Sequence, residues 1–166
     1  MDGKWALISV YNKDGIVEFV KELVTLGWSI IASGGTAKVL TESGISVRDT
    51  ASLVGGGAIL GHRVVTLSRE IHAALLAQDT PEDWRELYNL GIPRIDLVCV
   101  DFYPLEEEIN RPGATRESVI EKTDIGGPTM VSSAAKGQRI IICDPSHRQK
   151  VIDWLKEGKP NEPAGS

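Results

Sequence analysis

Strand-like apolar runs alternate with helical patterns along most of the chain, and this alternation limits the fold more than any other feature. "KWALISV" at 4–10 is typical of a buried strand, and apolar residues at 16, 19, 20 and 23 follow with the spacing of one helix face. "SIIAS" at 29–33 and "TAKVLTES" at 36–43 repeat the pair. Such alternation with short connections predicts an α/β fold with three layers and a mostly parallel, doubly wound sheet.

The second half of the chain continues the pattern. "IDLVCVDF" at 95–102 is the most continuous apolar run, so we expect this strand near the sheet centre with both faces covered. A last buried strand is predicted at 139–144, and helices at 68–77, 81–91, from near 115, 129–137 and 145–158. The glycine-rich segment 48–64 and the segment 103–113 predict loops, the first of them mobile.

The bulk properties predict one soluble domain. The chain has 166 residues, of which we assign 1–158 to a single domain and 159–166, "KPNEPAGS", to a disordered tail. The formal net charge is −5 without a Lys/Arg-rich run, so nucleic acid is not an expected partner. No apolar stretch approaches the roughly 20 residues of a membrane span, and the first ten residues lack signal-peptide character. We expect a cytoplasmic protein that contacts no membrane.

The two cysteines give no sign of redox chemistry. Cys99 and Cys143 both lie in apolar runs, and we expect them to be buried, reduced thiols. The three histidines, at 62, 72 and 147, have no metal-ligand spacing, so no metal site is predicted.

A glycine pair stands where the second predicted strand meets a helix, in "IIASGGTAKVL". Gly34 and Gly35 allow a sharp turn that exposes main-chain N–H groups at a helix N-terminus, where the helix dipole favours an anion. Ser33 and Thr36 add hydroxyl groups. This pattern predicts a phosphate-binding turn, and the alternative is a tight turn in which Thr36 is only the helix N-cap.

The end of the first strand offers a second polar group. "SVYNKDG" follows that strand as "ASGGT" follows the second, so Ser9 and Lys13 should open onto the same sheet edge. The alternative for Lys13 is a solvated surface residue. Walker-type and dinucleotide-binding fingerprints are both absent.

Further polar residues follow the later strands. "DFYPL", "TDIGGP" and "SSAAKG" bring Asp101, Tyr103, Asp124, the pair Gly126 and Gly127, and Lys136 to the ends of strands or helices. Asp124 and Lys136 would make an acid–base and electrostatic pair if they converge on one pocket. The alternatives are a helix-capping role for Asp124 and a helix-dipole role for Lys136.

These elements, in this order, resemble the IMP cyclohydrolase domain of the bifunctional purine-biosynthesis enzyme that also carries AICAR transformylase activity. "SGGT" marks the wider methylglyoxal-synthase-like fold, whereas "DIGGP" followed by "AAK" is more specific. The resemblance covers nearly the whole chain and implies a Rossmann-like sandwich that binds a purine-precursor ribonucleotide.

The resemblance also implies roles for individual residues. Phosphate-binding positions match Ser9, Lys13, Ser33, Gly34, Gly35 and Thr36. Base- and formamide-binding positions match Arg63, Thr66, Asp101, Gly126 and Gly127, and the catalytic positions match Asp124, Lys136 and Tyr103.

The implied reaction is the dehydrative ring closure of 5-formamidoimidazole-4-carboxamide ribonucleotide (FAICAR) to IMP. The expected partners are this ribonucleotide, a separate formyltransferase that supplies it, and, as a further option, a second copy of the chain. No metal or redox cofactor is implied. Because the chain ends where the transformylase region would begin, we expect a stand-alone cyclohydrolase.

The sequence departs from the family pattern at three places. Val65 replaces a family lysine, Ser68 and Arg69 replace a His-Pro pair, and Asp101 replaces an asparagine. One alternative is therefore a non-catalytic nucleotide-binding module of the same fold. Methylglyoxal synthase is a second alternative, disfavoured because the loop after the first strand lacks the His-Asp of that family.

Overall fold

A computed structural model describes residues 3–56, 59–60, 66–102 and 104–158. These residues form one five-stranded sheet, in which every pair of neighbouring strands is parallel, in the order β3-β2-β1-β4-β5. The strands are β1 (Trp5–Ser9), β2 (Ser29–Ala32), β3 (Val47–Asp49), β4 (Ile95–Val100) and β5 (Ile140–Ile142). The predicted α/β class with a parallel sheet is confirmed, and β4 lies inside the sheet beside the central strand β1.

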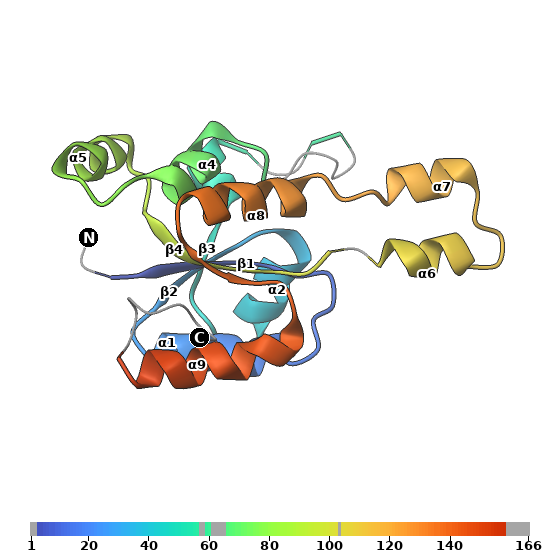
Figure 1. Ribbon diagram of the computed structural model, residues 1–166, viewed down its shortest axis with the longest axis horizontal. Coiled ribbons are helices and arrows are strands. Elements are labelled where there is room, and N and C mark those ends of the chain that lie inside the picture. The colour runs from blue at the N-terminus through green and yellow to red at the C-terminus, as the bar shows by residue number, and fades with distance from the viewer. Residues whose placement is uncertain (1–2, 57–58, 61–65, 103, 159–166) are drawn as a thin grey trace.

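Helices connect the strands and cover the sheet. They are α1 (Ile16–Thr25), α2 (Gly34–Glu42), α3 (Ala51–Val54), α4 (Arg69–Leu76), α5 (Pro81–Leu90), α6 (Leu105–Asn110), α7 (Arg116–Glu121), α8 (Gly126–Lys136), a 3-10 turn η1 (Pro145–His147) and α9 (Arg148–Lys156). Figure 1 shows α1 and α9 on one side of the sheet, and α4 and α8 on the other.

Side-chain alternation along the strands feeds two separate cores. In β1, Ala6 and Ile8 pack into the core under α1, α2 and α9, whereas Leu7 packs into the core under α4, α5 and α8. Successive strand residues point to opposite faces, so a strand covered on both faces is apolar throughout. The helix-like spacing of Ile16 and its successors places the predicted face of α1 in the first core.

Several helices begin and end at the residues that the sequence indicates. The Ser68 side chain accepts the N–H of Ile71 at the start of α4, and the Thr80 side chain accepts the N–H of Asp83 before α5. Gly91 ends α5 with φ 68°, a left-handed conformation that favours glycine. These caps satisfy main-chain groups that a helix end leaves unpaired.

Helices α6 and α7 form an arm that extends away from the sheet (Figure 1). Glu108 of α6 accepts hydrogen bonds from Nε and Nη2 of Arg111 at 3.0 and 2.8 Å. These bonds, with a further one from Ser118, lower the pKa of Glu108 to about 2. Only 4% of the Glu108 residue is exposed.

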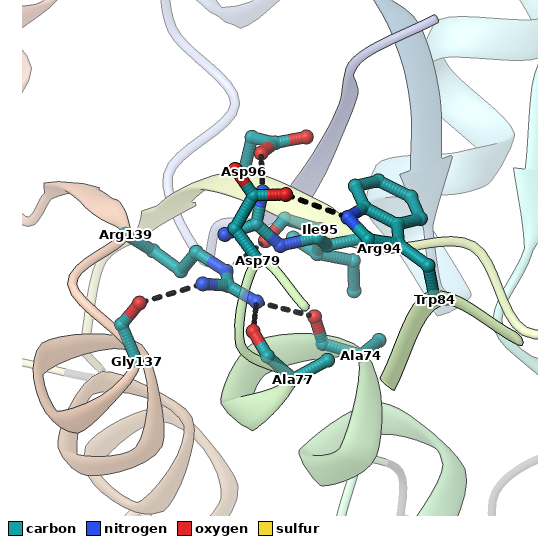
Figure 2. Close-up of polar contacts among 9 residues, drawn as sticks. All are labelled: Ala74, Ala77, Asp79, Trp84, Arg94, Ile95, Asp96, Gly137 and Arg139. Atoms are coloured by element: carbon teal, nitrogen blue, oxygen red, sulfur yellow. Dashed lines mark hydrogen bonds and ion pairs between the residues drawn. The ribbon is translucent and has the colours of Figure 1, made fainter. Parts of the chain in front are cut away.

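Arg139, just before β5, joins three elements at the end of the sheet where the strands begin. Its Nε donates to the carbonyl of Ile95 at 2.5 Å, and its terminal nitrogens donate to Gly137 at 2.6 Å and Ala77 at 2.7 Å. A weaker bond of 3.3 Å reaches Ala74 (Figure 2). Burial lowers the pKa of Arg139 to about 10. The guanidinium thus ties the C-terminal ends of α4 and α8 to β4.

The predicted loops were partly wrong. Segment 48–64, expected to be a mobile loop, contains the end of β3 and the whole of α3, while residues 57–58 and 61–64 of it lie outside the described residues. Segment 103–113 contains α6. A strand of only three residues and a six-residue helix give too little periodicity to be recognised in the sequence.

The start of α8 and the burial of Cys143 also differ from the predictions, and the domain boundary remains a prediction. Helix α8 begins at Gly126 instead of near 129, because Asp124 accepts a main-chain N–H of its first turn. Cys99 is buried as expected, but Cys143 is exposed, since it follows the last residue of β5. The domain boundary at 158 stays a prediction, and the tail 159–166 lies outside the described residues.

Candidate functional site

A cavity of about 990 Å³ opens at the carboxyl ends of the strands. Strand order reverses direction between β1 and β4, and open parallel sheets bind ligands at such a switch point. The cavity brings together most of the predicted site residues. Those that line it are Ser9, Lys13, Ser33, Gly34, Gly35, Thr36, Thr66, Asp101, Asp124, Gly126 and Gly127.

The N-terminus of α2 forms one end of this cavity. Ser33 is the N-cap, with φ −132° and ψ 158°, and its side chain makes no capping bond. The first helical bond runs from Ala37 N–H to the Ser33 carbonyl, so the N–H groups at 34–36 have no partner inside the helix. Gly34 has φ 54°, which explains the need for glycine there. This end can accept an anion.

Thr36 is not the helix N-cap, which was the alternative role considered from the sequence. It lies in the first turn of α2, not at the N-cap, and it is 3% exposed. Its hydroxyl accepts the N–H of Val10 at 3.2 Å and donates to the carbonyl of Val10 at 3.1 Å. The side chain therefore joins α2 to the end of β1, and it offers a ligand its main-chain N–H more readily than its hydroxyl.

Lys13 places a positive charge at the same end. Its Nζ donates to the carbonyls of Val10 and Tyr11, the latter at 3.1 Å. A side chain on Gly35 would place Cβ 3.8 Å from this Nζ, so the ammonium lies against the first turn of α2. Burial lowers the pKa of Lys13, and the nearby Asp101 carboxylate partly opposes that shift.

Asp101 follows β4 and faces the loop after β1. Its two carboxylate oxygens accept the main-chain N–H groups of Tyr11 and Asn12, the second at 3.0 Å. The carboxylate that departs from the family asparagine is thus bonded to the protein's own backbone.

Asp124 and the glycine pair form the other side of the cavity. Asp124 is half-buried, and its Oδ1 accepts the N–H of Gly127 at 3.0 Å. A side chain on Gly126 would place Cβ 2.7 Å from the Thr66 hydroxyl, and one on Gly127 would place it 2.9 Å from Oδ2 of Asp124. Only glycine lets Thr66 and Asp124 approach α8 so closely.

Three predicted site residues are not brought to the cavity by the described structure. Lys136 is the last residue of α8, is exposed, and does not line the cavity. Arg63 and Tyr103 lie outside the described residues, as does Val65. The catalytic and binding roles of all these residues stay predictions.

Part of the cavity wall was not predicted from the sequence. Asp49, Thr50 and Ala51 at the end of β3, Gly56, and residues 120–123 at the end of α7 also line it. Recognising β3 would have predicted the first group, because a third parallel strand must end at the same edge of the sheet. The approach of α7 depends on how the arm folds back, which no local pattern indicates.

Among the described residues, no group of three His, Cys, Asp or Glu is arranged to hold a metal ion. His72 Nδ1 lies 2.6 Å from Ser133 Oγ, which links α4 to α8. No helix in the described part of the chain is long and apolar enough to cross a bilayer.

Comparison with known proteins identifies the family. The model of the MGS-like domain matches residues 15–129, which include the α2 turn, Asp101, Asp124 and the glycine pair. The chain belongs to the MGS-like domain family. The parallel sheet with a cavity at its strand ends is the arrangement expected from the resemblance. The predicted family is therefore confirmed.

The relatives of this MGS-like domain include three proteins called bifunctional purine biosynthesis protein PurH. That of Persephonella marina is 48% identical over 93% of this chain, that of Desulfitobacterium hafniense 45% over 92%, and that of Caldicellulosiruptor saccharolyticus 47% over 93%. The chain spans only about 30% of the length of these relatives. The solved crystal structure of ForH is 38% identical, with a TM-score of 0.79 over 93% of this chain and 79% of that chain.

Proposed function

We propose that this MGS-like domain is an IMP cyclohydrolase, which closes the ring of FAICAR to give IMP. The observation that carries the proposal is that one cavity joins the anion-accepting end of α2 to Asp124 and the glycine pair of α8. The names of the PurH relatives place them in purine biosynthesis, which agrees with a purine-precursor ribonucleotide as ligand.

The 5′-phosphate would bind at the end of β2. There the free N–H groups of α2, the Ser33 hydroxyl and the Lys13 ammonium offer donors to phosphate oxygens. α8 begins at the β4 side, two strands away, and neighbouring strands are about 5 Å apart. The base and its formamide would thus lie near Thr66, Gly126, Gly127 and Asp124, with Arg63 added from the resemblance.

Ring closure then forms one bond and releases water. The carboxamide nitrogen attacks the formyl carbon, one hydrogen leaves each of the two nitrogens, and the formyl oxygen departs with both as water. The amide nitrogen is a poor nucleophile, so the enzyme gains most from holding the two groups in contact and removing a proton. Asp124 is the proposed base, and Tyr103 and Lys136 are assigned to the departing oxygen by the resemblance alone.

The reaction needs no redox cofactor, because no electrons are transferred, and the resemblance implies no metal. A separate formyltransferase would supply the formylated substrate. A second copy of the chain is proposed only as an option, since nothing in the described residues defines an interface.

Binding of IMP and inosine tests the phosphate end directly. Ligand at about 100 times its dissociation constant stabilises the folded state by about 2.7 kcal/mol. IMP should therefore raise the melting temperature strongly and inosine should not. Equal shifts from both ligands would remove the phosphate-binding turn from the proposal.

A non-catalytic nucleotide-binding module is the second candidate. The position of Lys136 outside the cavity favours it, because the departing oxygen would then lack the ammonium that the resemblance assigns to it. Turnover of FAICAR separates the two functions, and consumption of dihydroxyacetone phosphate tests methylglyoxal synthase.

A further inference from the structure

The loop segment 11–13, after β1, borders two hollows. Tyr11, Lys13 and Asp101 line the main cavity, and the same residues line a second hollow of about 550 Å³ together with Asn12, Phe102, Pro104 and Glu107. A segment that borders two hollows gains little from packing. Its position therefore depends on the hydrogen bonds of its main chain.

Asp101 supplies two of those bonds from the opposite strand. One carboxylate oxygen accepts the N–H of Tyr11 and the other accepts that of Asn12, at 3.0 Å, across about 90 positions of sequence. An ionised carboxylate is acceptor-only, so both oxygens can take this role. An asparagine would turn its NH₂ group toward one of the two N–H groups and lose that bond.

The carbonyl groups of the same stretch hold the Lys13 ammonium. Nζ donates to the carbonyls of Val10 and Tyr11, and it lies against Gly35 at the start of α2. The contacts thus run from Asp101 through the backbone at 10–12 to Lys13, and from there to the proposed phosphate position.

We infer that Asp101 is a positioning residue: it fixes the 11–13 loop so that the Lys13 ammonium meets the ligand's phosphate. This assignment rests on the proposed function and differs from the base contact that the resemblance implies for Asp101. It also predicts an effect on phosphate affinity opposite to the one expected from charge alone, because a nearby carboxylate repels a phosphate. The loss of Asp101 should weaken phosphate binding even though it removes a repulsive charge.

Calorimetric titration with IMP and with inosine tests this inference on Asp101→Asn and Asp49→Asn. Asp49 is the charge-matched control: it lines the same cavity, but its carboxylate accepts the N–H of Ala51 instead of one from the 11–13 loop. Asp101→Asn should weaken IMP binding about 10-fold, the loss of roughly one hydrogen bond, and leave inosine unchanged. Asp49→Asn should not weaken IMP binding.

A double-variant cycle identifies the route of the effect. If Asp101 acts through Lys13, Asp101→Asn should cost little further affinity in a Lys13→Met background, because residues in one network are not additive. Additive losses, or equal losses for IMP and inosine, would show a direct contact with the base and overturn the inference. Tighter IMP binding in Asp101→Asn would overturn it as well.

Amide hydrogen exchange in the ligand-free protein separates this inference from the proposed function. Asp101→Asn should speed exchange of at least one of the Tyr11 and Asn12 amides, while Asp49→Asn should not. Unchanged exchange at both amides would overturn the inference even if IMP binds. If exchange is faster in Asp101→Asn but the protein binds no IMP, the role of Asp101 in positioning the loop stands and the proposed function is wrong.

Discussion

The carboxylate of Asp124 accepts the N–H of Gly127 across 3.0 Å, and it does so at a point where Gly127 has no room for a side chain. The bond orients the carboxylate and caps the first turn of α8 at once. The two roles that the sequence left as alternatives, helix cap and catalytic base, therefore do not exclude each other. One oxygen is bonded to the helix, and Oδ2 lies beside Gly127 on the cavity wall.

Gly127→Ala should displace Asp124 without altering its chemistry. The added Cβ would lie 2.9 Å from Oδ2 of Asp124 and 3.0 Å from the ring of Phe102, so one of them must move. A misplacement of this size should lower the ring-closure rate about 10- to 100-fold. Gly56→Ala is the matched control, because Gly56 lines the same cavity and its Cβ would meet nothing within 4 Å. Equal rates in the two variants would contradict the proposed position of the carboxylate.

Lys13 should give phosphate binding a pH dependence below the ordinary lysine range. Burial lowers the pKa of Lys13 from 10.5, so the ammonium loses its proton at a lower pH than a free lysine does. The phosphate is already a dianion above about pH 7. IMP affinity should therefore hold at neutral pH and fall as the pH rises toward 10. Lys13→Met should bind more weakly at neutral pH and lose this alkaline decline, which titrations from pH 7 to 10 would measure.

Asp124→Asn and Lys136→Met should differ in effect. Loss of a general base costs about 10²- to 10⁴-fold in rate, and we expect that range for Asp124→Asn. Lys136 ends α8 ten residue steps from Gly126, which is about 15 Å along a helix. The fold loss in rate for Lys136→Met should therefore be at least about tenfold smaller than that for Asp124→Asn. Equal losses would show that the lysine reaches the reacting atoms by a route outside the described cavity.

Arg139→Met should destabilise the fold strongly. It removes a buried cation that donates to four main-chain carbonyls at the ends of α4, α8 and β4 (Figure 2). Leaving such groups unpaired should lower the free energy of unfolding by about 3 kcal/mol in urea denaturation. Lys156→Met is the control, since the side chains of Lys156 and Glu22 are 53% and 37% exposed and their ion pair should contribute less than about 1 kcal/mol. A loss below 1 kcal/mol in Arg139→Met would contradict this role.

The sheet and its main helices follow from patterns within short windows of sequence. The spacing of Ile16, Phe19, Val20 and Leu23, and the unbroken run in β4, indicate burial directly because period and apolarity determine which faces pack. Strand β3 was not predicted because its three residues, "VRD", with a charged residue at the centre, show no periodicity. Helix α6 was not predicted because its three glutamates and the flanking prolines are typical of a loop.

The cavity was predictable only in part, for a related reason. Parallel strands end at one edge, so Ser9, Ser33 and Asp101 had to lie near each other. The bonds from Asp101 to the Tyr11 and Asn12 backbone join residues about 90 positions apart, and neither side carries a local pattern for them. The distance of Lys136 from Gly126, by contrast, follows from helix rise alone.

Ring closure of FAICAR, followed by ultraviolet absorbance, tests the central claim most directly. The wild-type protein should form IMP faster than the same solution without protein, and Asp124→Asn should abolish most of that rate. Because Val65 replaces a family lysine, the wild type should be slow, and Val65→Lys should raise the rate about 10²- to 10³-fold without tightening phosphate binding. If neither wild type nor Val65→Lys forms IMP while both bind it, the domain is a nucleotide-binding module and the proposed enzyme function is wrong.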